Sequence, residues 1–238
     1  MMKLGIIGAM EEELVLIRNK INAKAIKTKA GKTFYKGEYM GVDIILTECG
    51  VGKVNAAVTT QILIDDFTVE KVICTGVAGA LNRALNVKDT VISKDVIQHD
   101  IDVSEDGYPK GYIPRLKIRE IKADNDLIIT AVNASKKILS DNKVHVGRIL
   151  TGDQFIASDE ASERLRKEFN GDCVEMEGGA IAQTCYLNNV PFVIIRSISD
   201  NANNMASTDY DSFVHDACRN SFLIVMSMIE EIAQEKDY

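Results

Sequence analysis

Short, nearly continuous apolar runs recur along the chain, each bounded by glycine or polar residues. Runs of this length are typical of strands buried on both faces of a sheet. They predict strands at 4–9, 71–81, 89–97, 145–153 and 191–200, and a glycine-rich loop (TGVAG) at the end of the second. The segment KTFYKGEYMGVDIILTE, residues 32–48, predicts a hairpin that turns at Met40-Gly41.

Helical periodicity fills the segments between these runs. Leu14, Ile17 and Ile21 recur at helical spacing behind acidic residues in the first turn. After the turn GVGK (50–53), Val54, Val58 and Ile62 predict one apolar helix face. Further helices are expected at 124–140, 159–169, 178–187 and from Tyr210 to the end.

Strands that alternate with helices predict an α/β fold with a right-handed, mostly parallel sheet. No internal repeat, low-complexity tract or linker interrupts the pattern. A chain of 238 residues can bury a sizeable core, and residues 1–238 are therefore predicted to form a single domain.

Charge and composition narrow the function classes. A net charge of −7 without a Lys/Arg-rich block argues against a nucleic-acid-binding surface. The apolar start is too short for a signal peptide and no run approaches transmembrane length, so we predict a soluble cytoplasmic protein without membrane contact. The five cysteines include no CxxC pair, which predicts reduced, buried thiols. The histidines are too scattered for a metal site, and His99-Asp100-x-Asp102 is better interpreted as a polar loop.

The segment CVEME (173–177) predicts a further short strand before the helix at 178–187. Three acidic residues lie at or beyond the carboxyl ends of predicted strands: Glu13, Glu177 and Asp200. Because ligands of α/β sheets bind beyond those ends, we expect the three side chains on one rim. An acid at a helix start often serves only the helix dipole, which accounts for the two glutamates before Glu13. It accounts less well for Glu177, because Glu175 already supplies a charge there and both lie among apolar residues.

The run VPFVIIRSISDNA (190–202) ends in polar residues after a buried strand. Ser199 offers a donor that can orient the carboxylate of Asp200. Partial desolvation would raise the pKa of that carboxyl and make it a plausible general acid.

The glycine-rich turns raise the question of a phosphate site. GVGK opens a helix whose amides favour anions, but it lacks the P-loop spacing, and GIIG is not a dinucleotide fingerprint. A tight strand-to-helix turn explains these glycines at least as well. In TGVAG, Gly79 would also let the backbone approach a ligand closely. No GxSxG and no cysteine beside a histidine supports a nucleophilic triad.

Seven segments occur together in one order: GIIGAMEEE, GVGKVNAA, TGVAGAL, HDIDV, TGDQFI, VEMEGGAIA and VPFVIIRSISDNA. In order and spacing the chain resembles the 5′-methylthioadenosine/S-adenosylhomocysteine nucleosidases of the purine nucleoside phosphorylase superfamily, over essentially its whole length. The resemblance implies a sandwich with a mixed central β-sheet flanked by helices. It also implies a nucleoside substrate and no metal or organic cofactor.

The resemblance assigns catalytic roles to three of these residues. Asp200 would protonate the purine N7, so that adenine leaves as a neutral group, and Ser199 would hold its carboxylate. Glu13 would bind and activate the attacking water. Cleavage of an N-glycosidic bond passes through an oxocarbenium-like sugar, which explains the need for an acid at the base and for anions near the cation.

Binding roles follow from the same resemblance. Glu177 would accept hydrogen bonds from the ribose hydroxyls and Met176 would pack on the sugar. Phe155 would stack on the base while the backbone of Ile156 reads its edge. Arg196 occupies the place of a family arginine that is buried near the carboxylates.

The chain departs from the family pattern at two places. Val77 stands where many relatives have serine in TGSAG. The polar segment 103–114, with two prolines and little apolar surface of its own, corresponds to one that reaches the 5′ pocket of a neighbouring subunit, and a homodimer is implied. Val103 and Pro114 match the family there, whereas Asp106 replaces an aromatic residue.

Other functions stay open at this point. A nucleoside phosphorylase would need basic residues for phosphate, which Glu13 would repel, and a futalosine hydrolase belongs to the same superfamily. A catalytically silent nucleoside-binding protein is a third possibility, against which the complete set of three carboxylates counts.

Overall fold

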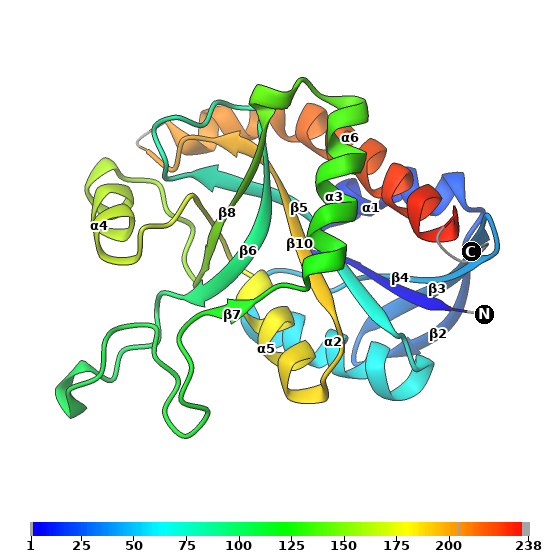
Figure 1. Ribbon diagram of the computed structural model, residues 1–238, viewed down its shortest axis with the longest axis horizontal. Coiled ribbons are helices and arrows are strands. Elements are labelled where there is room, and N and C mark those ends of the chain that lie inside the picture. The colour runs from blue at the N-terminus through cyan, green and yellow to red at the C-terminus, as the bar shows by residue number, and fades with distance from the viewer. Residues whose placement is uncertain (1, 204, 235–238) are drawn as a thin grey trace.

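A ten-stranded sheet carries helices on both of its faces (Figure 1). The computed structural model describes residues 2–203 and 205–234. The strands are β1 (Lys3–Gly8), β2 (Lys24–Lys29), β3 (Lys32–Tyr39), β4 (Val42–Glu48), β5 (Lys71–Ala80), β6 (Thr90–Gln98), β7 (Ile121–Lys122), β8 (Val144–Thr151), β9 (Cys173–Glu175) and β10 (Phe192–Asp200). The helices are α1 (Glu11–Lys20), α2 (Lys53–Phe67), α3 (Asn125–Ile138), α4 (Asp159–Phe169), α5 (Gly178–Asn188) and α6 (Ala206–Gln234).

The sheet mixes parallel and antiparallel pairs. Its strand order is β10-β6-β8-β9-β5-β1-β4-β3-β2, and an additional β5–β10 pairing closes five of these strands into a ring. Of the ten strand pairings within the described residues, five are parallel and five antiparallel. The mixed sheet flanked by helices is therefore confirmed, whereas the expectation of a mostly parallel sheet is wrong.

Successive residues of the central strands belong to opposite sides of the sheet. Ile6 packs with α1, α3 and α6, whereas its neighbour Ile7 packs with α2 and α5. Val193 and Ile194 on β10 divide in the same way. Because side chains alternate across a strand, a strand covered on both faces needs a continuous apolar run, which is the pattern seen in the sequence. The five cysteines are free and buried, as predicted.

Several elements differ from those predicted. TGVAG is not a loop, because β5 continues through it to Ala80. On α2, Val54 and Val58 are 76% and 43% exposed, and the helix instead buries smaller residues together with Ile62 and Leu63. The exposed strand β2 was not predicted, and α6 begins at Ala206 rather than Tyr210.

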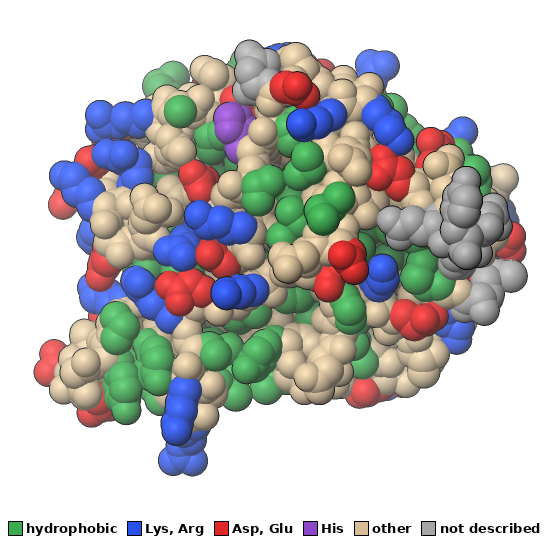
Figure 2. Space-filling model, in the orientation of Figure 1, with side chains coloured by type: hydrophobic (Ala, Val, Ile, Leu, Met, Phe, Trp, Pro, Cys, Tyr) green, Lys and Arg blue, Asp and Glu red, His purple; other side chains and the backbone are tan. Residues whose placement is uncertain are grey.

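The segment after β6 leaves the body of the molecule as an arm, defined here as residues 102–119, before the chain returns at β7 (Figure 1). Tyr108 and Tyr112 stack there with their ring centroids 4.7 Å apart, and Ile113 bridges Ile118. Hydrophobic side chains gather where the arm leaves the body (Figure 2). The arm thus carries more apolar surface than its sequence suggested.

Candidate active site

A cavity of about 350 Å³ opens where β1, β5, β9 and β10 end. It gathers residues from both halves of the chain, as the strand-end rule for α/β sheets predicts. The lining residues are Ala9, Met10, Glu13, Val51, Val77, Ala78, Gly79, Phe155, Val174, Glu175, Met176, Glu177, Ser199, Asp200, Ser207 and Tyr210. Glu13, Glu177 and Asp200 are therefore brought together, as expected.

Glu13 lies in the first turn of α1 and folds back on the end of β1. Its Oε2 accepts hydrogen bonds from the amides of Ala9 (2.6 Å) and Met10 (3.1 Å), and its Oε1 accepts one from Val77 (3.3 Å). Burial raises the pKa of Glu13, against the opposing effects of Arg196 and the three amides. Glu13 thus both caps its helix and presents a buried carboxylate to the cavity.

Glu175 and Glu177 flank the end of β9 and share one buried cation. Arg196 on β10 forms an ion pair with Glu175 and lies 3.9 Å from the Oε2 of Glu177. Glu175 also accepts bonds from the hydroxyl of Thr151 and from two amides at the start of α5, so it is held in place by several donors.

Glu177 is the less neutralised member of this pair. Its Oε1 accepts one hydrogen bond, from the amide of Gly52 (2.9 Å). Burial, followed by repulsion from Glu175, raises the pKa of Glu177 to about 7, with Arg196 and the Gly52 amide acting in the opposite direction. A buried carboxyl with so raised a pKa is a candidate for hydrogen bonding to a polar ligand.

Asp200 is the last residue of β10 and lines the same cavity. The hydroxyl of Ser199 donates to its Oδ2 (2.9 Å) and the amide of Ala202 to its Oδ1 (2.8 Å). Burial raises the pKa of Asp200, although these two hydrogen bonds lower it. The geometry predicted for Ser199 is confirmed, and Asp200 has the environment of a carboxyl that can hold a proton.

Two glycines of β5 allow the carboxylates to approach the strand. A Cβ on Gly76 would lie 2.5 Å from Glu13 Oε1 and 2.6 Å from Arg196 Nη1. A Cβ on Gly79 would lie 2.7 Å from Asp200 Oδ1. Any side chain at either position would displace a charged group of the site, which explains why this strand is rich in glycine.

The other predicted site residues divide into three groups. Phe155, Met176 and Gly79 line the cavity, and the ring of Phe155, 52% exposed, meets Tyr210 edge-on. Ile156 is buried in an adjoining apolar cluster and Arg196 lies behind the glutamates, so neither belongs to the lining. The third group is Val103, Asp106 and Pro114, which lie on the arm and do not line this cavity within the described chain.

Several lining residues were not predicted as site residues, among them Met10, Val51, Ser207 and Tyr210. Ser207 and Tyr210 come from the first turns of α6, whose start was placed four residues late. The hydroxyl of Tyr210 donates to the sulfur of Met10 at 3.1 Å, which joins the two ends of the chain over the cavity. Had the helix been predicted to begin at Ala206, both Ser207 and Tyr210 would have been expected in its first turns, near the carboxyl end of β10.

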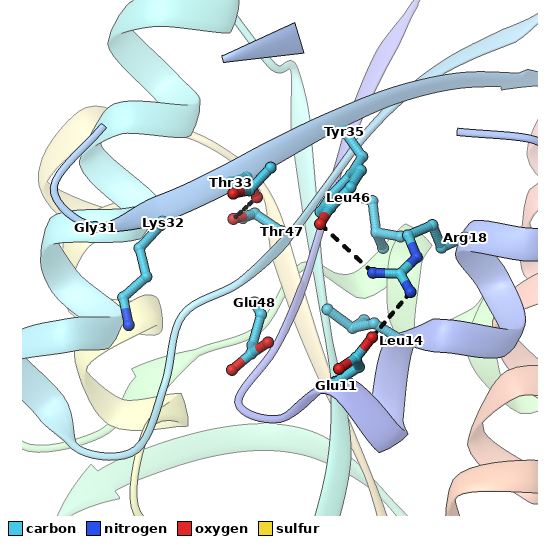
Figure 3. A pocket seen from close by; sticks show the side chains of 10 residues that line it. All are labelled: Glu11, Leu14, Arg18, Gly31, Lys32, Thr33, Tyr35, Leu46, Thr47 and Glu48. Atoms are coloured by element: carbon cyan, nitrogen blue, oxygen red, sulfur yellow. Dashed lines mark hydrogen bonds and ion pairs between the residues drawn. The ribbon is translucent and has the colours of Figure 1, made fainter. Parts of the chain in front are cut away.

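A second, smaller hollow of about 160 Å³ lies between α1 and the strands β3 and β4 (Figure 3). Its carboxylates face solvent: Glu11 forms an ion pair with Arg18 at 2.9 Å, and Glu48 is exposed. Solvated pairs of this kind contribute little energy. Of the carboxylates that line these two hollows, the buried ones belong to the larger cavity, which is therefore the candidate active site.

The lining of the candidate active site is acidic. Among the described residues that line it there are four carboxylates and neither lysine nor arginine. Elsewhere in the described chain, Asp100 of the His99-Asp100-x-Asp102 segment forms an ion pair with Lys53. Within residues 2–203 and 205–234, no group of His, Cys, Asp or Glu has the arrangement of a metal site. None of the helices in those ranges has the length and apolarity needed to cross a bilayer.

The chain matches known proteins over nearly its full length. A family model described as "Phosphorylase superfamily" matches residues 3–230. A 5′-methylthioadenosine/S-adenosylhomocysteine nucleosidase of Staphylococcus haemolyticus is 38% identical over 228 residues, which cover 95% of this chain and 99% of the relative. The nucleosidase of Bacillus cytotoxicus is 40% identical over 233 residues, 97% of this chain and 100% of that one. The chain belongs to the 5′-methylthioadenosine/S-adenosylhomocysteine nucleosidase family.

Solved structures of similar proteins have the same fold. The nucleosidase of Neisseria meningitidis in complex with methylthio-immucillin-A has a TM-score of 0.92 and 38% identity, covering 97% of this chain and 100% of that one. Futalosine hydrolase of Helicobacter pylori strain 26695 also has a TM-score of 0.92, with 34% identity, covering 97% and 98%. The predicted resemblance to the nucleosidase family and the predicted fold class are both confirmed.

Proposed function

We propose that the chain hydrolyses the N-glycosidic bond of 5′-methylthioadenosine and S-adenosylhomocysteine, and also of 5′-deoxyadenosine. The products are adenine and the corresponding 5-thioribose or 5-deoxyribose. The observation that carries this proposal is the cavity itself: three buried carboxylates from different strand ends line it, and the described part of its lining includes neither lysine nor arginine. Such a site favours a sugar that becomes positively charged and disfavours phosphate.

Asp200 acts as the general acid. Burial raises the pKa of this carboxyl, so a proton is available for the purine N7, while Ser199 and the Ala202 amide keep the group aimed into the cavity. Protonation lets adenine depart as a neutral molecule. General acid catalysis of this kind contributes roughly 10²–10⁴-fold to the rate.

Glu13 binds and activates the attacking water. Among the described residues two amides donate to its Oε2, whereas its Oε1 accepts the longer bond from Val77, and the residue lines the cavity. Glu177 accepts hydrogen bonds from the ribose hydroxyls, which offset the cost of burying its charge. As the glycosidic bond breaks, both carboxylates also stabilise the positive charge on the sugar.

Phe155, Ile156 and Met176 orient the nucleoside. The exposed ring of Phe155 stacks on the base, and the backbone of Ile156, held by its buried side chain, reads the edge of the base. Met176 lies between the two glutamates in the lining and packs on the sugar. No step in this sequence calls for a metal or an organic cofactor.

The arm completes the site of a second subunit in a cytoplasmic homodimer. Val103, Asp106 and Pro114 lie outside the cavity of their own chain, which supports a role in a partner's 5′ pocket. The exposed side chains of Val51, Val54 and Val58 beside the cavity offer apolar surface for the same contact. In the cell the enzyme would serve methionine salvage by removing both thio-nucleosides.

Turnover of a panel of nucleosides tests the proposal. The chain should release adenine from methylthioadenosine, S-adenosylhomocysteine and 5′-deoxyadenosine, as followed by chromatography. Futalosine as the only substrate would favour the other hydrolase of this fold. Binding of adenine without turnover of any nucleoside would identify a silent binding protein and overturn the proposal.

A further inference from the structure

The N-terminus of α2 holds carboxylates from two distant parts of the chain. The helix begins after Gly52, which has no side chain to cap it. The amide of Gly52 donates to Glu177 Oε1 (2.9 Å), and the amide of Lys53 donates to Asp153 Oδ1 (2.8 Å). Adjacent amides at a helix start, aligned with the helix dipole, suit two anions in this way.

Asp100, just beyond β6, closes the arrangement. Its Oδ1 accepts from the ammonium group of Lys53 at 2.6 Å, and its Oδ2 accepts from the amide of Asp153 at 3.0 Å. Lys53, Asp100 and Asp153 therefore form a cycle of three hydrogen bonds that joins α2, the end of β6 and the loop after β8. We call these three residues the Lys53–Asp100–Asp153 network.

The loop after β8, residues 152–158, is also held by the amide of Gly152, which donates to the carbonyl of Glu175 at 3.2 Å, and by the edge-on contact of Phe155 with Tyr210. Asp153, Gln154 and Phe155 are exposed, and Ile156 is the next buried side chain. Phe155 is thus suspended between a polar anchor at Asp153 and an apolar anchor at Ile156. Loss of the polar anchor would leave only Ile156 and the Tyr210 contact to hold the ring, and its position at the cavity would become less fixed.

We propose that the Lys53–Asp100–Asp153 network positions the base-binding and sugar-binding parts of the site relative to each other. Through Asp153 it fixes the loop that carries Phe155, and through the start of α2 it fixes the amide that holds Glu177. Its members do not line the cavity, so they are positioning residues rather than catalytic ones. The inference rests on the proposed function, because it assigns Phe155 and Glu177 to the two halves of a nucleoside.

The charges of the network suit this role. The side chains of Lys53 and Asp100 are 19% and 21% exposed, so their contact is shielded from much of the solvent. Although burial opposes it, the Lys53 and Asp153 donors hold the pKa of Asp100 below its usual value. The ion pair therefore persists at neutral pH, where the site has to work.

Asp100→Asn tests the network, because it keeps the shape and removes the charge. We expect KM for methylthioadenosine to rise about tenfold, the effect of losing one charge-assisted hydrogen bond. Because Asp200 is untouched, kcat should stay within about threefold. Amide hydrogen exchange of residues 152–157, measured without ligand, should accelerate. Lys53→Met should behave in the same way, and the double variant should be no worse than the worse single one.

Asp43→Asn is the matched control. Asp43 pairs with Lys36 at 3.1 Å near the start of β4, at the end of the strands away from the cavity, and its side chain is 14% exposed. The Asp43→Asn substitution should leave KM for methylthioadenosine and the hydrogen exchange of residues 152–157 unchanged. If KM and exchange in Asp100→Asn and Lys53→Met stay within about twofold of the unsubstituted protein, the inference is overturned. An unsubstituted protein without turnover would overturn the proposed function alone, since the exchange measurement still decides the role of the network.

Discussion

Three carboxyl groups of the same chemical type acquire different properties from their surroundings. Glu13 is held by three amides, Glu177 by one amide and a shared arginine, and Asp200 by a hydroxyl and one amide. Burial raises the pKa of all three, but Arg196 opposes it only for the two glutamates. Arg196 therefore favours the charged form of the two glutamates, whereas no arginine opposes the effect of burial on Asp200.

Asp200→Asn should remove the acid and preserve the fold of the site. The amide keeps the shape of the side chain but cannot deliver a proton to the base. We expect kcat to fall by about 10²–10⁴-fold while the affinity for nucleoside largely survives, as measured by steady-state kinetics and calorimetry. Ser199→Ala, which removes one donor to Asp200, is the milder companion variant. More than about a tenth of the original kcat in Asp200→Asn would exclude Asp200 as the essential acid, since that is under about 1.4 kcal/mol.

The raised pKa of Glu177 should make the free energy of unfolding depend on pH. Its pKa is raised from 4.5 to about 7, so the folded protein binds a proton between these values that the unfolded chain has released. The free energy of unfolding contributed by this group is therefore largest below about pH 4.5 and decreases as the pH rises towards 7. In Glu177→Gln the decrease should be smaller, as followed by thermal unfolding across this range without ligand. Identical slopes in the two proteins would show that Glu177 titrates normally.

At the scale of elements, strand ends bring the site together and the covering helices shape it. The buried strands were predictable because both of their faces are covered, which leaves a continuous apolar run. The face of α2 was not, because the helix packs through Ala56, Thr59 and Thr60 and leaves Val54 and Val58 outside. Strand β2, exposed along its whole length and rich in lysine, carries no apolar signal. The position of β2 in the sheet depends on its pairing with β3, which the local sequence does not indicate.

The arm supplies a prediction about 5′ specificity. Asp106 lies exposed in a short 3₁₀ turn (Ser104–Asp106) on the arm. If the arm caps a partner's 5′ pocket, Asp106→Phe should lower KM for methylthioadenosine more than for S-adenosylhomocysteine, whose polar tail tolerates a wetter pocket. One apolar contact is worth roughly 1–3 kcal/mol. Glu105→Phe, in the same turn, is the control. Equal effects on both substrates, or a fully active monomer in solution, would show that the arm does not take part in substrate recognition.

At the scale of the whole molecule, residues near both ends of the chain meet over one cavity. Three acids and a serine were predictable from sequence, because each follows a buried strand and such ends converge. That Met10, Ser207 and Tyr210 line the same cavity was not predictable, since it depends on how α6 crosses the sheet. The capping of α2 by Asp153 joins residues 100 positions apart and leaves no local pattern.

In the proposed reaction water, and not phosphate, attacks the sugar in this acidic cavity. Adenine release from methylthioadenosine, measured with and without added inorganic phosphate and combined with identification of the sugar product, tests it most directly. We expect equal rates in both conditions and free 5-methylthioribose as the product. A strict requirement for phosphate, with the sugar 1-phosphate as product, would contradict it.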